Sequence, residues 1–321
     1  MLDYKTGLPE VMELKEEREP DQSYAKRIKD RVGKNDLFIF DQGYAVTPTF
    51  KEIEQQGGYF ISKLNIWSVN LYTESEGKYK RIDVLKMLNK LDEGIEKVTQ
   101  IECYVGNKDT KIKVRFFAHR VRQSIADQRR RRLYKKARRE GRKPSKAALQ
   151  LCNWNLIISN IEKKKRISYS HIVGFYKIRW NIEIFFKQLK SILNINKTAT
   201  KTNGYRFTTE IIGKFILAIF ISYCYSIARK NSWDESGIEI SIEKTVKHFK
   251  RHVWELIEKI KRGLKHVIKF IKGLIRKIIH RCQKYRQRSR QNSLDMLIEG
   301  RICKGVEYVK LPRTKLIKFV S

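Results

Sequence analysis

One carboxylate and a group of cations share one face of a predicted helix. The stretch GFYKIRWNIEIFFKQLKS, residues 174–191, repeats apolar residues with the period of a half-buried helix. At about 100° per residue, Glu183 falls on the face opposite the apolar stripe. The same face carries two aromatic residues and three cations, which are Tyr176, Arg179, Trp180, Lys187 and Lys190. A carboxylate framed in this way suits a metal ion beside phosphates, although an exposed Glu183–Lys187 ion pair is the simpler alternative.

A second carboxylate, Asp41, favours a metal site over a simple ion pair at Glu183. Asp41 directly follows the run LFIF, residues 37–40, which predicts a short strand buried on both faces. Active sites of parallel sheets lie at the carboxyl ends of strands. Oxygen ligands from Asp41 and Glu183 would together suit Mg²⁺ or Mn²⁺, and such ions activate water against a phosphodiester. The two side chains are therefore predicted to meet at a shared ion.

The elements around Asp41 are predicted to be α/β. A strand is expected at residues 8–16, followed by a charged helix at 21–32 with Asp21 as its N-cap. After Asp41, a helix is predicted to start with Thr47 as N-cap and to end at Gly57–Gly58, before a strand within residues 58–65. Strand, helix and strand with short connections imply a right-handed parallel crossover.

The segment from residue 66 to about 122 has a different pattern. Apolar and polar residues alternate between turn sequences, and residues 80–84 (KRIDV) form one of these runs, which predicts an antiparallel sheet. A basic helix with a glycine break follows, with eleven Lys or Arg between residues 128 and 146, and then a strand at 153–161. Four consecutive arginines occupy all sides of the basic helix, so DNA contact is preferred over a solvated arm, with RNA left open; they are Arg129, Arg130, Arg131 and Arg132.

Composition points to a polyanionic partner. The 321 residues carry 70 Lys+Arg against 34 Asp+Glu, a formal charge of +36. A compact protein with so many repelling charges usually binds nucleic acid or, less often, an anionic membrane surface. The longest apolar run, residues 215–228, is shorter than a membrane span and predicts a core helix. Five dispersed cysteines fit a reducing cytosol and argue against disulfides or structural zinc.

The residues after 231 are helical, basic and poor in acids. Their aliphatic stripe is expected to bury against the catalytic domain or a partner helix, and the helices to serve as a dimer interface, a DNA-contacting region or both. The stripe consists of Val253, Ile257, Ile260, Leu264, Ile268, Ile271 and Ile275.

Three segments resemble a known enzyme family. Tyr176-x2-Arg179-x3-Glu183-x6-Lys190 is similar, without a spacing error, to the Y-R-E-K signature of the IS4-type DDE transposases. Residues 40–65 resemble the region around that family's second catalytic aspartate, and residues 145–161 resemble the strand that leads to its glutamate helix. The resemblance covers roughly residues 1 to 230.

The resemblance implies an α/β fold with an RNase H-like core of the retroviral integrase superfamily. A β-rich insertion would interrupt that core, giving a first core part at 1–65, the insertion with its basic helix at 66–153, a second core part at 154–230 and a basic helical region at 231–321.

The resemblance also implies roles for residues. Asp41 and Glu183 would be the catalytic metal ligands for Mg²⁺ or Mn²⁺. Water would attack a phosphodiester at the transposon end, and the freed 3′-OH would attack another strand. Tyr176, Arg179 and Lys190 would contact phosphates. Lys187 would add a phosphate contact, and Trp180 would either stack on a displaced base or pack the helix. The implied partners are double-stranded DNA, at transposon ends and target, and a second copy of the chain on that DNA, in the bacterial cytoplasm at the nucleoid and not at a membrane.

Such enzymes use three carboxylates, and the sequence supplies two in the matching positions. Asp3 is a weak substitute because it stands beside a Thr6–Gly7 turn, and Asp21 is better explained as a cap. The expectation is a transposase copy without its N-terminal part that binds DNA and cuts it poorly. The alternatives are a non-catalytic DNA-binding remnant and, less well supported, a general nuclease.

Overall fold

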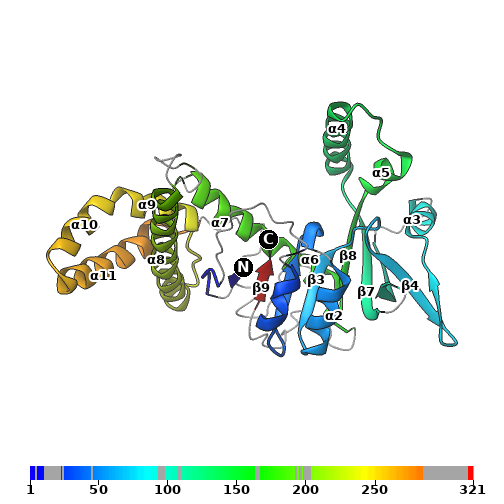
Figure 1. Ribbon diagram of the computed structural model, residues 1–321, viewed down its shortest axis with the longest axis horizontal. Coiled ribbons are helices and arrows are strands. Elements are labelled where there is room, and N and C mark those ends of the chain that lie inside the picture. Colours follow the sequence, from blue (N-terminus) through cyan, green and yellow to red (C-terminus); the bar gives the residue numbers. More distant parts are fainter. Residues whose placement is uncertain are drawn as a thin grey trace. The chain divides into compact units, whose positions relative to one another are not determined.

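The computed structural model describes residues 1–3, 6–10, 23, 25–44, 46–92, 98–107, 110–162, 167–191, 194, 197, 204–284 and 317–320. The chain forms two compact units (Figure 1). We call residues 17–176 with Val320 the sheet unit, and residues 1–16 and 177–319 with Ser321 the helical unit. The predicted division at residues 65, 153 and 230 stays a prediction.

The sheet unit contains the predicted parallel pair of strands. Strands β2 (Leu37–Phe40) and β3 (Tyr59–Lys63) run parallel and are joined by α2 (Thr47–Gln55). All four residues of β2 are buried, as expected for a strand covered on both faces. Phe50 of α2 stacks on Phe60 of β3 with ring centroids 4.2 Å apart. The crossover helix therefore packs directly on the strands that it connects.

The start of α2 differs in one detail from the prediction. Val46 is the N-cap residue, without a side-chain cap, and Thr47 is already helical. Pro48 lies in the first turn, as predicted, because its missing N–H would have no partner there in any case. Gly57, with φ +73°, ends the segment in the left-handed region that glycine adopts without steric cost.

An antiparallel sheet continues from β3. β8 (Trp154–Ser159) pairs antiparallel with β3, and the remaining strands follow in the order β7, β6, β4, β5, all antiparallel. Their bounds are β7 (Lys111–Arg120), β6 (Val98–Gly106), β4 (Asn70–Ser75) and β5 (Lys78–Arg81). The predicted β-rich segment is thus confirmed as antiparallel, and the unit is a mixed α/β structure.

The strand predicted at residues 80–84 is partly wrong. β5 ends at Arg81, and α3 (Val84–Asp92) begins where the strand was expected to continue. Asp83 caps this helix, since its Oδ1 accepts the N–H of Lys86 at 2.9 Å.

The basic segment forms two helices. α4 (Gln123–Arg139) follows β7, and α5 (Lys146–Leu151) precedes β8. Gly141, with φ +63°, lies in the turn between them, as the predicted glycine break requires. Figure 1 shows α4 and α5 standing beyond the end of β7 and β8.

The prediction of a single helix at 174–191 is wrong, because the helix is interrupted at Arg179. α6 (Tyr169–Ile178) ends there and α7 (Trp180–Ser191) begins. The Asn181 side chain donates to the Ile178 carbonyl at 2.7 Å and so satisfies an acceptor that the break would otherwise leave open. The candidate residues therefore lie on two helices and not on one continuous face.

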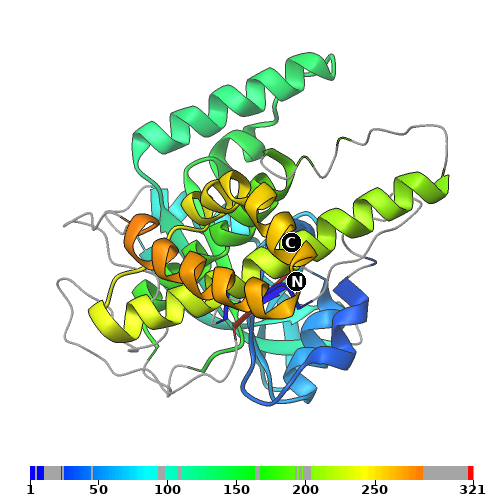
Figure 2. The ribbon, with the colours of Figure 1, turned by 90° about the vertical axis from the view of Figure 1, so that its left-hand side faces the viewer.

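Among its described residues, the helical unit contains four further helices: α8 (Gly204–Ser236), α9 (Ile242–Arg251), α10 (Val253–Lys261) and α11 (Leu264–Arg281). They share one core cluster, which includes Ile221, Phe249, Leu274 and Ile278. α10 and α11 form a hairpin beside α8 (Figure 2). The predicted helical character of the region after residue 231 is confirmed for α8 to α11, but it is wrong for residues 317–320, which form a strand, β9 (Ile317–Val320).

The aliphatic stripe of the last helices is divided. Val253, Ile271 and Ile275 pack against the shared core. Ile260 and Leu264 are 58% and 74% exposed. The expected burial against a catalytic domain or a partner helix stays a prediction for the exposed part.

α8 is longer than the apolar run that predicted it. It has 33 residues, and within the described chain it is the helix that is long and apolar enough to cross a membrane by length and composition alone. One face of it, including Ile221, Cys224 and Ala228, lies in the shared core, which is the predicted role. Another face carries exposed Ile216 and Tyr223.

Two predictions near the N-terminus are tested only in part. Residues 11–16 of the strand expected at 8–16 lie outside the described residues, as does Asp21. The helix expected at 21–32 is present as the 3-10 helix η1 (Lys26–Arg31). β1 (Leu2–Asp3) pairs antiparallel with β9 (Ile317–Val320) through Phe319 and Lys318.

Candidate functional site

Asp41 leaves the carboxyl end of β2, in the sheet unit. The register that pairs Phe40 with Ser62 places Lys63, the last residue of β3, beside it at the same edge. Two side-chain bonds hold β3 against β8: Ser159 Oγ donates to the Phe60 carbonyl at 2.7 Å, and the Phe60 N–H donates to Asn160 Oδ1 at 2.7 Å. Pairing between distant segments therefore fixes the edge from which Asp41 projects.

The Asp41 carboxylate is half-buried and lies among donors. Its Oδ1 accepts the backbone N–H of Gln42 at 2.8 Å, and the Tyr176 hydroxyl lies 3.4 Å from the same oxygen. The backbone turns at once into the 3-10 helix η2 (Gln42–Tyr44). Tyr176 is a sequence-predicted site residue 135 positions further along the chain, so the fold brings these two candidates together.

Tyr176 reaches Asp41 because α6 is anchored at its start. Arg115 of β7 is buried, and its guanidinium donates to the Ile167 carbonyl at 2.7 Å and to Gln100 Oε1 at 2.9 Å. Tyr169, in the first turn of α6, packs on Phe117 with ring centroids 5.7 Å apart. Burial lowers the pKa of Arg115, and the charge of Glu102 opposes this shift, while the two acceptors satisfy the N–H groups of the guanidinium.

Glu183 lies on α7, in the helical unit, and is held by a local ion pair. Arg179 Nη2 lies 2.6 Å from Glu183 Oε1, one helical turn earlier in the chain. The Arg179 side chain is 15% exposed and that of Glu183 is 38% exposed. The simple alternative predicted from the sequence paired Glu183 with Lys187, and the structure pairs it with Arg179.

The other candidates of α7 point to solvent. Trp180 is 59% exposed, and Lys187 and Lys190 are exposed. Lys187 lies near α9, where it contributes, after Lys247, to lowering the pKa of the Glu243 carboxyl. Exposed side chains can be reached by a large ligand, and the DNA contacts of Trp180, Lys187 and Lys190 stay a prediction.

The four arginines of α4 divide into two pairs. Arg129 donates to the Trp154 carbonyl at 3.0 Å and to Asn155 at 2.6 Å. Arg130 donates to Asn153 Oδ1, directly before β8. Arg131 and Arg132 are exposed. Half of the predicted DNA-contacting set thus also fastens α4 to the sheet.

The donor set fits a hard divalent ion only in part. Asp41 and Glu183 offer carboxylate oxygens at accessible positions, as Mg²⁺ or Mn²⁺ prefers. Within the part of the chain that the structure describes, no group of three or more His, Cys, Asp and Glu side chains could hold a metal. Asp3 is buried and accepts the Thr6 hydroxyl at 2.6 Å, so its carboxylate holds the turn before Gly7.

Sequence reasoning missed Lys63 as a neighbour of Asp41. The signal was available, because the residue that ends a strand parallel to β2 must lie at the same edge as the residue that leaves β2.

Comparison with known proteins now decides the family. The family model described as a transposase DDE domain matches residues 1–220, which is more than half of the chain. The chain belongs to this family. The predicted resemblance is therefore confirmed, and the matched region contains Asp41, Tyr176 and Glu183.

Individual relatives agree with the family. The chain is 24% identical over 253 residues to the transposase for insertion sequence element IS231F of Bacillus thuringiensis subsp. israelensis, covering 75% of this chain and 52% of the relative. It is 23% identical over 282 residues to that of IS231E of Bacillus thuringiensis subsp. finitimus (84% and 57%). It is 28% identical over 223 residues to that of IS1151 of Clostridium perfringens (63% and 44%). The chain spans about half the length of the curated relatives it matches, and no solved structure matches it.

Proposed function

We propose that this chain acts in DNA transposition, as a metal-dependent transposase that hydrolyses a phosphodiester at a transposon end and transfers the strand. The observation that carries the proposal is the Y-R-E-K spacing together with Asp41, which leaves a buried strand and has Tyr176 beside it at 3.4 Å. In this proposal the fold is an RNase H-like core with a β-rich insertion. The chain works on DNA in the bacterial cytoplasm, associated with the nucleoid, as a homodimer.

The residues have separate tasks in this reaction. Asp41 and Glu183 would hold Mg²⁺ or Mn²⁺, which when bound supplies an activated water and neutralises the leaving oxygen. Tyr176, Arg179 and Lys190 orient the phosphates of the scissile strand, since in-line phosphoryl transfer depends mainly on positioning and charge. Arg179 has to share its guanidinium between Glu183 and a phosphate, because the two groups now form an ion pair at 2.6 Å.

A non-catalytic DNA-binding role is the second candidate. It is favoured by the same ion pair, which occupies the Glu183 carboxylate, and by the lack of a third carboxylate at a metal cluster among the described residues. The charge of +36 supports DNA binding in either case.

One substitution separates the two candidates. Glu183→Ala in a transposase should abolish Mg²⁺-dependent nicking of a duplex that carries the element's terminal sequence, while leaving affinity for that duplex within about threefold. Glu140→Ala, which removes an exposed carboxylate that also pairs with an arginine at 2.6 Å, is the matched control and should leave nicking unchanged. If the wild-type protein binds the duplex but does not nick it with Mg²⁺ or Mn²⁺, the result would contradict the transposase proposal and support the non-catalytic role.

A further inference from the structure

Trp67 is a large aromatic side chain held out into solvent by a well-fixed turn of the sheet unit. Its side chain belongs to the loop after β3, and 65% of it is exposed. The Leu64 N–H donates to the Leu156 carbonyl at 3.0 Å, which ties the start of the loop to β8. The Asn65 side-chain oxygen accepts the backbone N–H of Trp67 at 3.1 Å, and the Asn65 backbone carbonyl accepts the N–H of Val69 at 3.0 Å. Such a turn fixes the backbone and leaves the indole without cover, which costs hydrophobic free energy unless a ligand covers it.

A cationic groove lies on one side of Trp67. It has a volume of about 670 Å³ and runs between the carboxyl end of β3 and one face of α4. Among the described residues that line it none is acidic, although the chain has 34 Asp and Glu. Lys63, Arg132 and Lys136 contribute cations, and Gln42, the residue directly after Asp41, lies at its wall. The groove therefore favours a polyanion and begins next to the candidate metal ligand.

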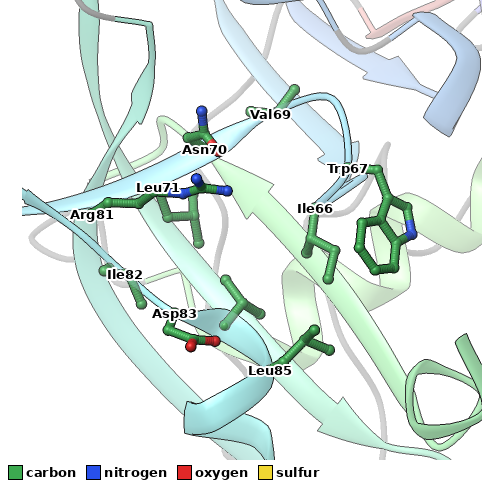
Figure 3. Close-up of a pocket in the computed structure, with 10 residues that line it drawn as sticks. Ile66, Trp67, Val69, Asn70, Leu71, Arg81, Ile82, Asp83 and Leu85 are labelled. Atoms are coloured by element: carbon green, nitrogen blue, oxygen red, sulfur yellow. The ribbon is translucent and has the colours of Figure 1, made fainter. Parts of the chain in front are cut away.

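A hollow with a mixed polar and apolar lining lies on the other side. Figure 3 shows the Trp67 indole at one end of it beside Ile66, with Arg81 on the opposite side. Its volume is about 370 Å³, and Leu71 and Leu85 are among the apolar side chains that line it. Asp83 is in the lining but is already engaged as the cap of α3, with Lys86 as its donor. The hollow can therefore take a flat group with apolar faces and polar edges next to the indole.

We propose that the turn and the two hollows form a binding site for an unpaired DNA strand, with one base stacked on Trp67 and the adjoining phosphates on Lys63, Arg132 and Lys136. Stacking on an exposed aromatic needs a free base face, which a paired duplex does not offer, and an acid-free groove suits the phosphates that flank such a base. The site rests on the proposed function, because cleaved or opened transposon ends would supply the unpaired strand. It assigns a role to Trp67, which the charge pattern of the sequence did not reveal.

The test compares two DNA probes on the full chain. A 5′-fluorescein-labelled oligothymidine reports binding of an unpaired strand, and a duplex of the element's terminal sequence reports binding of paired DNA. Trp67→Ala should weaken oligothymidine binding by about tenfold, as expected for loss of one stacking partner, and should change duplex affinity by less than about twofold. Trp254→Ala is the matched control, since Trp254 is 79% exposed on α10 of the helical unit, and it should leave both affinities unchanged.

A conservative variant separates stacking from charge. Trp67→Phe should keep oligothymidine affinity within about threefold and should lose part of the tryptophan fluorescence quenching that the oligonucleotide causes. Arg132→Gln should instead lower the slope of log affinity against log salt by about one, with quenching retained.

The possible results lead to different conclusions. Oligothymidine binding that Trp67→Ala leaves unchanged, or that Trp254→Ala weakens equally, would overturn the site while duplex binding still supports the proposed function. Equal or tighter binding of oligouridine would overturn the assignment to DNA, and displacement by a short polyglutamate at equal concentration would indicate an acidic peptide instead. Failure of the wild-type chain to bind either DNA probe would overturn the proposed function itself.

Discussion

Asp41 of the sheet unit and Glu183 of the helical unit are both candidate metal ligands, but different interactions hold them. Asp41 owes its position to the pairing of β2 with β3, and its oxygen meets a backbone N–H and the Tyr176 hydroxyl. Glu183 lies on a single helix, where it forms an ion pair with Arg179, four residues earlier. The first carboxylate is fixed by distant parts of the chain and the second by a neighbour on its own element.

This difference has a chemical consequence. A carboxylate has about four lone-pair sites, so one that accepts from an N–H and a hydroxyl can still bind a metal. A carboxylate in an ion pair has to share its charge, so metal binding at Glu183 competes with Arg179. DNA phosphates would relieve that competition by taking the guanidinium, which would couple metal binding at Glu183 to DNA binding.

The largest expected effect follows from exchanging either carboxylate for an amide. With Fe²⁺ in place of Mg²⁺, and with ascorbate and peroxide, radicals cut the polypeptide near the bound ion. If Asp41 and Glu183 share an ion, the wild-type chain is cut near both residues, and Asp41→Asn or Glu183→Gln should each reduce cutting at both places by more than about tenfold. The fragments are read by gel electrophoresis and mass spectrometry.

Glu140→Gln is the control for this experiment, because Glu140 is an exposed carboxylate in an ion pair with Arg142. It should leave both cuts in place. Cutting at only one of the two places, or a cut near residue 183 that persists in Asp41→Asn, would contradict a shared ion.

Arg179→Gln should have a smaller effect on metal-dependent cutting, and it tests whether the ion pair distinguishes Glu183 from Asp41. Removing the guanidinium frees Glu183, so we expect the iron-dependent cut near residue 183 to be retained or stronger without DNA. Loss of one phosphate contact should lower the salt slope of duplex binding by about one. The free energy of unfolding should change by less than about 0.5 kcal/mol, because the partner carboxylate is more than a third exposed and water screens the pair.

The matched variant is Arg179→Lys, which keeps the charge but not the planar fork. It should restore the salt slope but only part of the affinity. A large drop in metal-dependent cutting in Arg179→Gln would mean that Arg179 positions Glu183 and does not compete for it.

Tyr176→Phe tests the Asp41 side. The hydroxyl is 3.4 Å from Asp41 Oδ1, near the long limit of a hydrogen bond, so its loss should alter metal affinity by less than about threefold. A role in phosphate positioning predicts a drop of about tenfold in nicking of the terminal duplex with a smaller change in duplex affinity. Tyr134→Phe, an exposed tyrosine on α4, is the control and should leave nicking unchanged.

The sheet-side half of the candidate site was predictable because local signals and packing agree there. LFIF predicts a strand buried on both faces, and Pro48 and Gly57 bound the helix that returns the chain to a parallel neighbour. These signals place Asp41 at a strand end. They do not reveal Tyr176 as its neighbour, since that contact depends on how Arg115 anchors α6.

The helix-side half was predicted less well, because apolar periodicity continues across the break at Arg179. Ile178 and Ile182 are both buried, so the spacing suggests one helix although the backbone interrupts it. Asn181 was the available signal, since its side chain bonds the Ile178 carbonyl. Likewise, the count of arginines in α4 could not tell that Arg129 would bond to β8, because a linear sequence does not say which helix face meets the sheet.

The smallest expected effect concerns stability against pH in the helical unit. His248 of α9 is buried, and its Nε2 has no hydrogen-bond partner among the described residues. Burial lowers the pKa of His248, and the charges of His252, Arg281, Lys277 and Arg251 lower it further. The unfolded chain therefore binds a proton at higher pH than the folded chain, so the free energy of unfolding should fall as pH drops through and below about 6.5.

Urea unfolding followed by circular dichroism, at about pH 7.5 and about pH 5.5, measures this loss. His248→Gln should flatten the difference, because the amide does not titrate. It should not remove it entirely, since burial also lowers the pKa of His171 in the sheet unit, where Nδ1 accepts the Ser168 N–H at 3.0 Å and would lose that bond on protonation. A pH dependence that His171→Gln abolishes and His248→Gln leaves intact would place the sensitive step at the start of α6, the helix that carries Tyr176 toward Asp41, and not in the helical unit.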